Sequence, residues 1–300
     1  MNETIQNGIA VTGALGNLGW KLLCHLAEHS ASPRLVGLDL RPAEPGRLER
    51  LQTLSEIHAD PARIELLTCD LGDFHDARWR NVIHEVSAVV HFAARNPFPE
   101  ATWDDATRSM DMTNHISQAS ADSSTLKRFV FASSNHVMGR YKDANIGAGQ
   151  LHTELEAGVG TRWFTGQKEM DSTIYATAKF AGERQCRMLG QKGDTSFVCV
   201  RIGWCQPGEN LPGTLSAAGT PTQHSDPDPG LDQTNRWFKE MWLSNRDFLH
   251  LFDRALLTES LEWPENCIVV NGMSDNMQMA WDLTRTRRFL DYAPKDDVYA

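Results

Sequence analysis

A tyrosine and a lysine lie four residues apart in the segment STIYATAKFAGE. The segment has helical propensity, so Tyr175 and Lys179 are expected to project from one face of a helix. A lysine ammonium beside a tyrosine stabilises the phenolate and lowers the pKa of the phenol, which makes the tyrosine a usable general base. Such pairs also occur by chance on helix surfaces, so this prediction depends on further residues.

A serine in the segment FVFASSNHVMG supports this interpretation. The apolar start of the segment predicts a strand, and Ser134 follows near its end. In a parallel α/β sheet the loops at the strand ends face the ligand crevice. There Ser134 can hydrogen-bond the oxygen that Tyr175 deprotonates. Together these side chains predict proton removal from an alcohol.

The glycines of VTGALGNLG predict a dinucleotide site. Gly13 permits the tight turn out of a strand, Gly16 lets main-chain N–H groups approach a pyrophosphate, and Gly19 lets the following helix pack closely. Asp39 ends the next strand 20 residues after Gly19. An acid there accepts hydrogen bonds from the adenosine ribose and repels a 2′-phosphate, so NAD is favoured over NADP. Arg41 is the one residue nearby that favours NADP.

The elements that position these residues alternate between strands and helices, which predicts an α/β fold with a doubly wound parallel sheet. Residues 1–203 are expected to form an NAD-binding domain with the catalytic residues. Residues 204–300 are expected to form a small substrate lobe within the same compact unit. The Pro- and Gly-rich segment 206–233 is interpreted as an excursion over the active site. The expected strands are Gly8–Thr12, Arg34–Asp39, Ile64–Cys69, Ala88–Ala93, Arg128–Ala132, Phe197–Ile202 and Cys267–Asn271, and the helices include Trp20–Glu28, Asn235–Leu243 and Arg246–Leu257.

Composition narrows the function classes. The chain has 300 residues with 41% hydrophobic and 23% charged residues, as in ordinary globular enzymes. A net charge of -10 argues against nucleic acid as the main partner. No signal-peptide pattern and no apolar run near the roughly 18 residues of a membrane span are visible, so a cytoplasmic protein without membrane contact is expected. The six cysteines lack metal-binding spacing, so reduced thiols and no metal site are expected.

Some conspicuous side chains have ordinary structural explanations. Asp70 in TCDLGD is placed to contact the adenine edge, but it could equally be a helix N-cap. His91 lies inside an expected buried strand and is interpreted as structural. Tryptophans more often pack in the core than contact substrate. Those given the core interpretation are Trp204, Trp237, Trp242 and Trp281.

Four motifs in order, TGALGNLG, Phe92–Ala94, SSNHVMG and YATAK, resemble the extended short-chain dehydrogenases/reductases over nearly the whole chain. Within that superfamily, SSNH, VRIGWC and WLSNRDF look like the uronate dehydrogenases and the NAD-dependent glucose-6-phosphate dehydrogenases. Sulfoquinovose dehydrogenases belong to the same superfamily. The resemblance implies NAD-dependent oxidation of the anomeric carbon of a free sugar to a lactone. It also implies an anionic monosaccharide as substrate and a homodimer or higher homo-oligomer.

The resemblance assigns roles position by position. Tyr175 is the base, Lys179 is its partner and contacts the nicotinamide ribose, and Ser134 is the second hydroxyl. The cofactor residues are Gly13, Gly16, Asn17, Leu18, Gly19, Asp39, Asp70, Leu71, Phe92, Ala93, Ala94, Tyr175, Lys179 and Ile202. The substrate residues are Arg95, Asn96, Ser134, Asn135, His136, Tyr175 and Arg201, with Arg201 matching the arginine that holds the C6 carboxylate of a uronate. The alternative for Arg201 is a structural ion pair at the strand end, and for Arg95 and His136 it is a loop residue that is solvated or satisfied by local hydrogen bonds.

Two features depart from the family pattern. The asparagine of the family's long helix has no clean equivalent in SMDMTNHIS, where Asp111 or Asn114 could take its place. The segment Ala144–Asp171 is longer than in a uronate dehydrogenase and is expected over the pocket.

The candidate cations exceed what one carboxylate needs, which favours a 6-sulfo or 6-phospho hexose over a uronate. These cations are Arg95, Arg140, Lys142, Arg162, Lys168 and Arg201.

Three alternatives remain at this level. A uronate dehydrogenase would use the same groups. Nucleotide-sugar epimerases and dehydratases share the fold and the Tyr–Lys pair but retain NAD, and they usually need a larger lobe than the one after Gly203. An NAD-binding scaffold without turnover would not need the intact Ser134, Tyr175 and Lys179 set.

Overall fold

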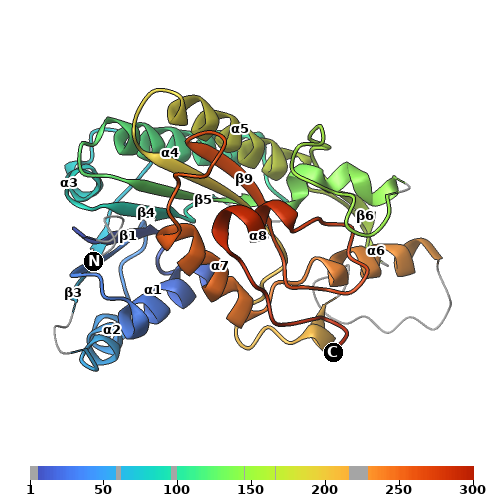
Figure 1. Ribbon diagram of the computed structural model, residues 1–300, viewed down its shortest axis with the longest axis horizontal. Helices are drawn as coiled ribbons and strands as arrows, with labels where there is room; N and C mark the ends of the chain where they lie inside the picture. The colour runs from blue at the N-terminus through green and yellow to red at the C-terminus, as the bar shows by residue number, and fades with distance from the viewer. Residues whose placement is uncertain (1–5, 59–61, 96–99, 145, 166, 216–228) are drawn as a thin grey trace.

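A seven-stranded parallel sheet forms the centre of the computed structural model, which describes residues 6–58, 62–95, 100–144, 146–165, 167–215 and 229–300. The strand order is β3-β2-β1-β4-β5-β8-β9 (Figure 1). The chain winds outward in both directions from the β1/β4 pair, which confirms the doubly wound fold. The strands are β1 (Ile9–Thr12), β2 (Arg34–Asp39), β3 (Arg63–Thr68), β4 (Ala88–His91), β5 (Arg128–Ser134), β8 (Ser196–Ile202) and β9 (Cys267–Gly272).

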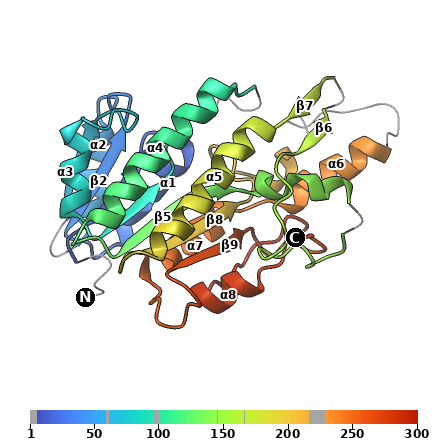
Figure 2. The same cartoon turned by 90° about the horizontal axis from the view of Figure 1, so that it is seen from above.

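Helices cover both faces of this sheet (Figure 2). One layer holds α3, α4 and α5, and the other holds α1, α2, α7 and α8. Because the inner strands are buried on both sides, they consist of nearly continuous apolar residues. The helices are α1 (Asn17–His29), α2 (Arg47–Ser55), α3 (Ala77–Glu85), α4 (Trp103–Asp122), α5 (Thr173–Gly190), α6 (Pro229–Glu240), α7 (Asn245–Leu257) and α8 (Thr284–Leu290), with 3₁₀ segments η2 (Asn135–Asp143) and η3 (Pro212–Thr214).

The part of the chain after residue 203 is joined to this sheet. Strand β9 pairs in parallel with β8, from Phe197 opposite Cys267 to Ile202 opposite Gly272. Its helices α7 and α8 pack with α1 and β9. The side chains of Phe248 and Phe252 on α7 are fully buried in one cluster with residues of β1 and α1.

The observed elements differ from the predicted ones mainly at their ends. Strand β4 ends at His91, before the predicted Ala93, because the chain turns there and the Ala93 N–H bonds the Thr12 hydroxyl. Strand β5 continues through Ser134, so both serines of the ASSN segment lie in the sheet. A short antiparallel hairpin, β6 (Arg162–Phe164) and β7 (Glu169–Asp171), was not predicted.

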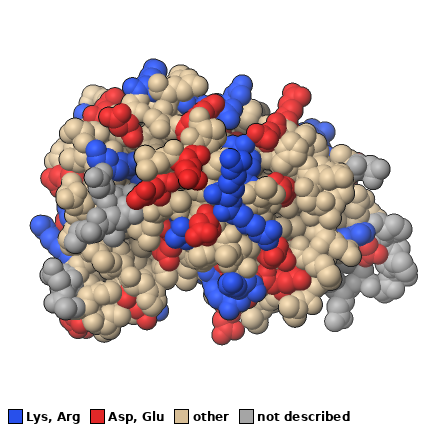
Figure 3. Space-filling model, viewed as in Figure 1, with Lys and Arg blue, Asp and Glu red and all other residues tan. Residues whose placement is uncertain are grey.

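Acidic and basic side chains are mixed over the face shown in Figure 3, with basic side chains gathered over α8. Arg285 pairs with Glu154, and Arg287 pairs with Asp275. The gathering is therefore largely neutralised by acids from other segments. No helix in the described part of the chain is long and apolar enough to cross a membrane.

Close packing at the start of α1 leads to a first testable expectation. A Cβ added at Gly19 would press against the main-chain carbonyl of Gly13. We expect Gly19→Ala to lower the free energy of unfolding by about 2 kcal/mol, as in other overpacked sites, measured by urea denaturation. The control is Gly213→Ala, since a Cβ at Gly213 would meet open space. Equal stability of the two variants would contradict the packing argument.

Candidate active site

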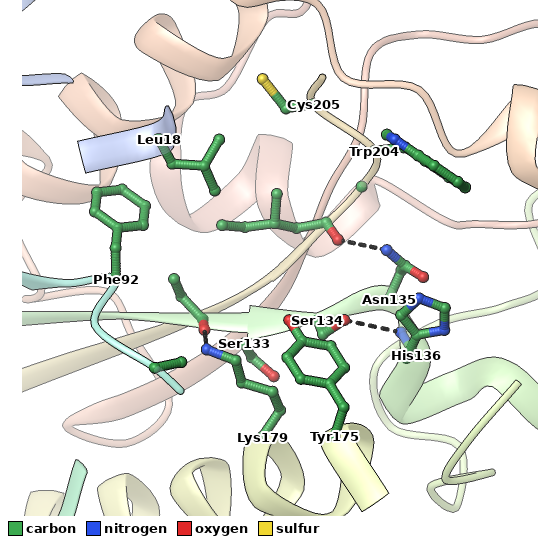
Figure 4. A pocket seen from close by; sticks show the side chains of 14 residues that line it. Leu18, Phe92, Ser133, Ser134, Asn135, His136, Tyr175, Lys179, Trp204 and Cys205 are labelled. Atoms are coloured by element: carbon green, nitrogen blue, oxygen red, sulfur yellow. Dashed lines mark hydrogen bonds between the residues drawn. The ribbon is translucent and has the colours of Figure 1, made fainter. Parts of the chain in front are cut away.

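A cavity of about 310 Å³ opens at the carboxyl ends of the central strands (Figure 4). Its lining comes from the start of α1, the turn after β4, the end of β5 with the start of η2, the first half of α5 and the turn after β8. This is the position where doubly wound sheets bind ligands. The lining residues are Leu18, Phe92, Ala94, Ala132, Ser133, Ser134, Asn135, His136, Tyr175, Lys179, Ile202, Gly203, Trp204 and Cys205.

Helix α5 carries Tyr175 and Lys179 into this cavity from one of its faces (Figure 4). The Lys179 Nζ lies 5.9 Å from the centre of the Tyr175 ring. It also donates a hydrogen bond of 2.7 Å to the main-chain carbonyl of Ala132 on β5. Burial lowers the pKa of Lys179 to about 8. The lysine is thus a pre-oriented ammonium that stays charged near neutral pH.

Ser134 lies beside Tyr175, as its position at the end of β5 predicts (Figure 4). Two effects act on the phenol: burial raises the pKa of Tyr175, and the hydrogen bond with Ser134 lowers it. Burial is the larger effect, so in the protein alone the pKa is raised and the predicted lowering is absent. The cause is desolvation, which disfavours the phenolate until a further positive charge enters the site.

Asn135 and His136 directly follow Ser134 in the chain. The Nδ1 atom of His136 is 2.7 Å from the Thr161 hydroxyl and 2.9 Å from the Ser172 hydroxyl. Burial lowers the pKa of His136 to about 3, so the ring is neutral. Asn135 Nδ2 donates to the carbonyl of Ile202 at 2.9 Å. Both side chains line the cavity, in a conformation set by neighbouring polar groups.

Sequence analysis missed Thr161 and Ser172, which flank the β6–β7 hairpin. The segment Ala144–Asp171 contains this hairpin, and its Trp163 ring stacks on His136 at 6.0 Å between centroids. The segment was predicted to lie over the pocket, and the part of it that reaches the cavity-lining His136 is the base of the hairpin. Nothing local in the sequence pairs these hydroxyls with a histidine 25 and 36 residues away.

The glycine segment forms a cradle beside the cavity. Gly13 has a φ of +63°, and a Cβ there would lie 2.9 Å from the Ala93 nitrogen. Gly16 precedes α1 without a side-chain cap, which leaves the first N–H groups of the helix for a ligand. Asn17 Nδ2 bonds the carbonyl of Cys205, and Leu18 lines the cavity.

Asp39 lies at the tip of β2 beside this cradle. Its carboxylate accepts N–H bonds from Leu15 at 2.9 Å and from the Arg41 main chain at 3.0 Å, and the Arg41 Nε lies at 3.2 Å. The acid is therefore held in a fixed orientation. Arg41 is two-thirds exposed and pairs with Asp39. The cradle, the uncapped helix end and this carboxylate together fit a dinucleotide without a 2′-phosphate.

Some of the other predicted cofactor residues line the cavity, and others do not. Asp70 is exposed and accepts the Gly72 N–H, while the N-cap of α3 is Asp76. Leu71 is buried, and its carbonyl accepts from His115. The cavity is lined by Phe92, Ala94 and Ile202.

The predicted partners for a substrate anion are engaged elsewhere. Arg201 donates from Nε and Nη2 to the Glu183 carboxylate at 2.9 and 2.8 Å, with both side chains 4% exposed, and it does not line the cavity. Its predicted role in holding the anion is therefore not supported, because a buried carboxylate already occupies its guanidinium. Arg95 pairs with Asp105 at 2.7 Å. Asn96 lies outside the described residues.

The remaining candidate cations also have partners. Lys142 pairs with Asp143, Arg162 with Asp171 and Lys168 with Glu100, while Arg140 donates to the Val159 carbonyl and the Thr173 hydroxyl. Every lysine and arginine of the chain lies within the described ranges, and Lys179 is the only one that lines the cavity.

The helix asparagine, the strand histidine and the tryptophans each have a defined place in the structure. On α4, Asn114 accepts a bond from Gln185 and Asp111 is exposed, and neither lines the cavity. His91 is fully buried between the Thr12 and Thr113 hydroxyls, which confirms its structural interpretation. Core packing is confirmed for three of the tryptophans, and the fourth packs against Phe238 while also lining the cavity. The three are Trp237, Trp242 and Trp281, and the fourth is Trp204.

Among the residues that the structure describes, no group of three or more His, Cys, Asp or Glu side chains is placed to hold a metal ion. The six cysteines are free thiols, four of them buried. The cavity presents hydroxyls, one ammonium, one neutral imidazole and the Cys205 thiol.

Comparison with known proteins agrees with this geometry. Residues 9–204 match the model of the NAD dependent epimerase/dehydratase family. The chain is 30% identical to an NAD-dependent glucose-6-phosphate dehydrogenase of Haloferax volcanii, over 96% of this chain and 93% of the relative. It is 29% identical to a uronate dehydrogenase of Pseudomonas syringae pv. tomato, over 98% and 84%.

A solved structure shows the same fold. The glucuronic acid dehydrogenase of Chromohalobacter salexigens superposes with a TM-score of 0.66 at 22% identity, covering 97% of this chain and 85% of that one. The family match spans the glycine cradle, β5 and α5, which are the elements that build the cavity. The chain therefore belongs to the NAD dependent epimerase/dehydratase family.

Proposed function

We propose that this protein is an NAD-dependent sugar 1-dehydrogenase, which oxidises the anomeric C1 of a free aldose to a lactone. The observation that carries the proposal is the meeting of Ser134, Tyr175 and Lys179 in one cavity beside the glycine cradle. Two relatives named as sugar dehydrogenases support it over nearly the full chain.

The proposed reaction divides into a proton and a hydride transfer. Ser134 binds the C1 hydroxyl, and the Tyr175 phenolate removes its proton as the C1–H bond breaks. Bound NAD would supply the hydride acceptor, and its positive charge would favour the phenolate. The Lys179 ammonium stabilises the same phenolate and orients the nicotinamide ribose. The sugar loses two electrons and two hydrogens and becomes the lactone.

The proposed substrate is an aldose with an anionic group at C6, such as a 6-phospho or 6-sulfo hexose, and the alternative is a hexuronate. The names of the two relatives support an anionic sugar. Asn135 and His136 are proposed to contact its hydroxyls, since both line the cavity as neutral hydrogen-bonding groups.

The test is NADH formation, followed by absorbance, with glucose 6-phosphate, sulfoquinovose, glucuronate and glucose as separate substrates. The proposal expects reduction of added NAD by at least one anionic sugar. Retention of NAD without net reduction would instead support an epimerase of the same family. Absence of turnover with every sugar would overturn the dehydrogenase assignment.

The resemblance of the motifs supports a homodimer or higher homo-oligomer. The net charge of -10 and the sequence pattern support a cytoplasmic location without a nucleic acid or membrane partner. Light scattering coupled to size-exclusion chromatography measures the first of these. A monomer at micromolar concentration would contradict it.

Asp39 provides a test of cofactor choice. Replacing Asp39 by asparagine removes the charge that repels a 2′-phosphate and keeps an acceptor for the Leu15 N–H. We expect the preference for NAD over NADP, as a ratio of kcat/KM, to fall by about 10-fold. The exposed Glu49→Gln serves as control and is expected to leave the ratio unchanged. An unchanged ratio in Asp39→Asn would place cofactor selection elsewhere.

A further inference from the structure

A buried carboxylate ties the catalytic helix to two strands of the sheet. Glu183 lies one turn after Lys179 on the same face of α5. Its carboxylate accepts a 2.5 Å bond from the Ser133 hydroxyl on β5 and two bonds from Arg201 on β8. The Glu183 and Arg201 side chains are each 4% exposed. One side chain thus links three elements.

The strands held by this carboxylate carry the catalytic groups in adjacent positions. Ser134 follows Ser133, and the carbonyl of Ala132 accepts from the Lys179 ammonium (Figure 4). Next to Arg201 on β8, Ile202 lines the cavity, and its carbonyl holds Asn135. A shift of α5 relative to β5 would therefore change the Tyr175–Ser134 geometry directly.

Gly182, next to Glu183 on α5, packs closely against β5. A Cβ at Gly182 would lie 2.5 Å from the Phe131 ring of β5. Helix α5 therefore packs so closely on β5 at this position that only glycine fits. Apolar contact of this kind sets the distance between helix and strand but does not fix sliding along the strand. Two parallel hydrogen bonds from a guanidinium do fix such a position.

Stability alone gives little reason for this pair. Burying two charges costs desolvation energy, and well-packed apolar replacements of similar volume are often as stable or more so. The Arg201 Nη1 atom is also buried without a partner among the described residues. We propose that the Glu183–Arg201 pair, through Ser133, is a positioning device that holds Tyr175 and Lys179 of α5 in register with Ser134. This inference rests on the proposed function.

The decisive variant replaces both charges with apolar side chains, Glu183→Leu together with Arg201→Met. We expect it to fold with a Tm close to that of the wild type. Its kcat for sugar oxidation should fall about 10-fold, while KM for NAD and for the sugar changes less than about 2-fold. Ser133→Ala, which removes one of the three bonds, should give a smaller fall in kcat.

The matched control is Arg128→Met. Arg128 is also buried, but it lies at the opposite end of β5, where it bonds the Ser196 hydroxyl and the carbonyls of Ala255 and Thr258. Its loss should lower Tm and leave kcat unchanged. If the Glu183–Arg201 pair were merely structural, the double variant would likewise have a lower Tm and an unchanged kcat.

Three outcomes overturn the proposal. Wild-type kcat in the double variant would make the pair structural. A sugar KM raised about 100-fold with kcat unchanged would instead return Arg201 to the anion role predicted from the sequence. A crystal structure supplies the test that needs no turnover: Tyr175 should move from Ser134 by about 0.5–1 Å in the double variant. An unmoved Tyr175 contradicts the inference even if no sugar is oxidised by the wild type, a result that would separately reject the proposed function.

Discussion

Replacing Tyr175 by phenylalanine is expected to lower kcat for sugar oxidation by about 100-fold or more. The change removes one oxygen, the group proposed to take the proton from the C1 hydroxyl, and keeps the partly buried ring in place. NAD should bind with unchanged affinity, because the glycine cradle and Asp39 lie away from the phenol. Steady-state kinetics give kcat, and quenching of tryptophan fluorescence gives the Kd for NAD.

The control for this experiment is Tyr141→Phe. Tyr141 donates its hydroxyl to the Glu156 carbonyl and does not line the cavity. It should retain wild-type turnover. If Tyr175→Phe also retained wild-type turnover, another group would be the base. The roles proposed for Ser134 and Lys179 beside Tyr175 would then be wrong as well.

Replacing Lys179 by methionine is expected to lower kcat/KM by about 100-fold at pH 7, with an effect that depends on pH. Burial raises the pKa of Tyr175. A positive charge nearby favours the phenolate, and the Lys179 Nζ lies 5.9 Å from the ring centre. Without it the rise of activity with pH should move to higher pH. Because the pKa of Lys179 is about 8, its ammonium is present below pH 8 and is lost as the pH rises through 8.

The difference between wild type and Lys179→Met should therefore be largest below pH 8 and narrow above it. A pH–rate profile from pH 6 to 10 measures both enzymes. Lys192→Met, at an exposed position, should follow the wild-type curve throughout. A constant ratio between Lys179→Met and wild type at every pH would show that Lys179 only orients the cofactor.

The fold was largely predictable because it depends on local patterns. Apolar runs bounded by helices specify a buried parallel sheet, and all seven of its strands were found within two residues of their observed ends. The β6–β7 hairpin was not predictable, since three-residue strands such as RWF and EMD carry no periodicity. It is held by contacts with residues distant in the sequence.

The site was predictable where spacing alone places the groups. The spacing of four residues places Tyr175 and Lys179 on one helix face, and the three glycines lie together in one strand-to-helix turn. The ion pair of Arg201 with Glu183 could not be chosen over the anion role, because a strand-end arginine gives no local sign of its partner. Glu183 was visible in the motif YATAKFAGE, but its contact with β8 requires α5 to lie across the sheet.

The hydroxyls of Thr161 and Ser172 brace His136 from a hairpin that contributes no strand to the main sheet. Under the proposed function, in which His136 contacts the sugar, hydride chemistry and sugar choice fall to separable parts of the molecule. A descendant chain could lengthen, shorten or rewrite this hairpin and so acquire a new sugar, with its tyrosine, lysine and serine inherited unchanged.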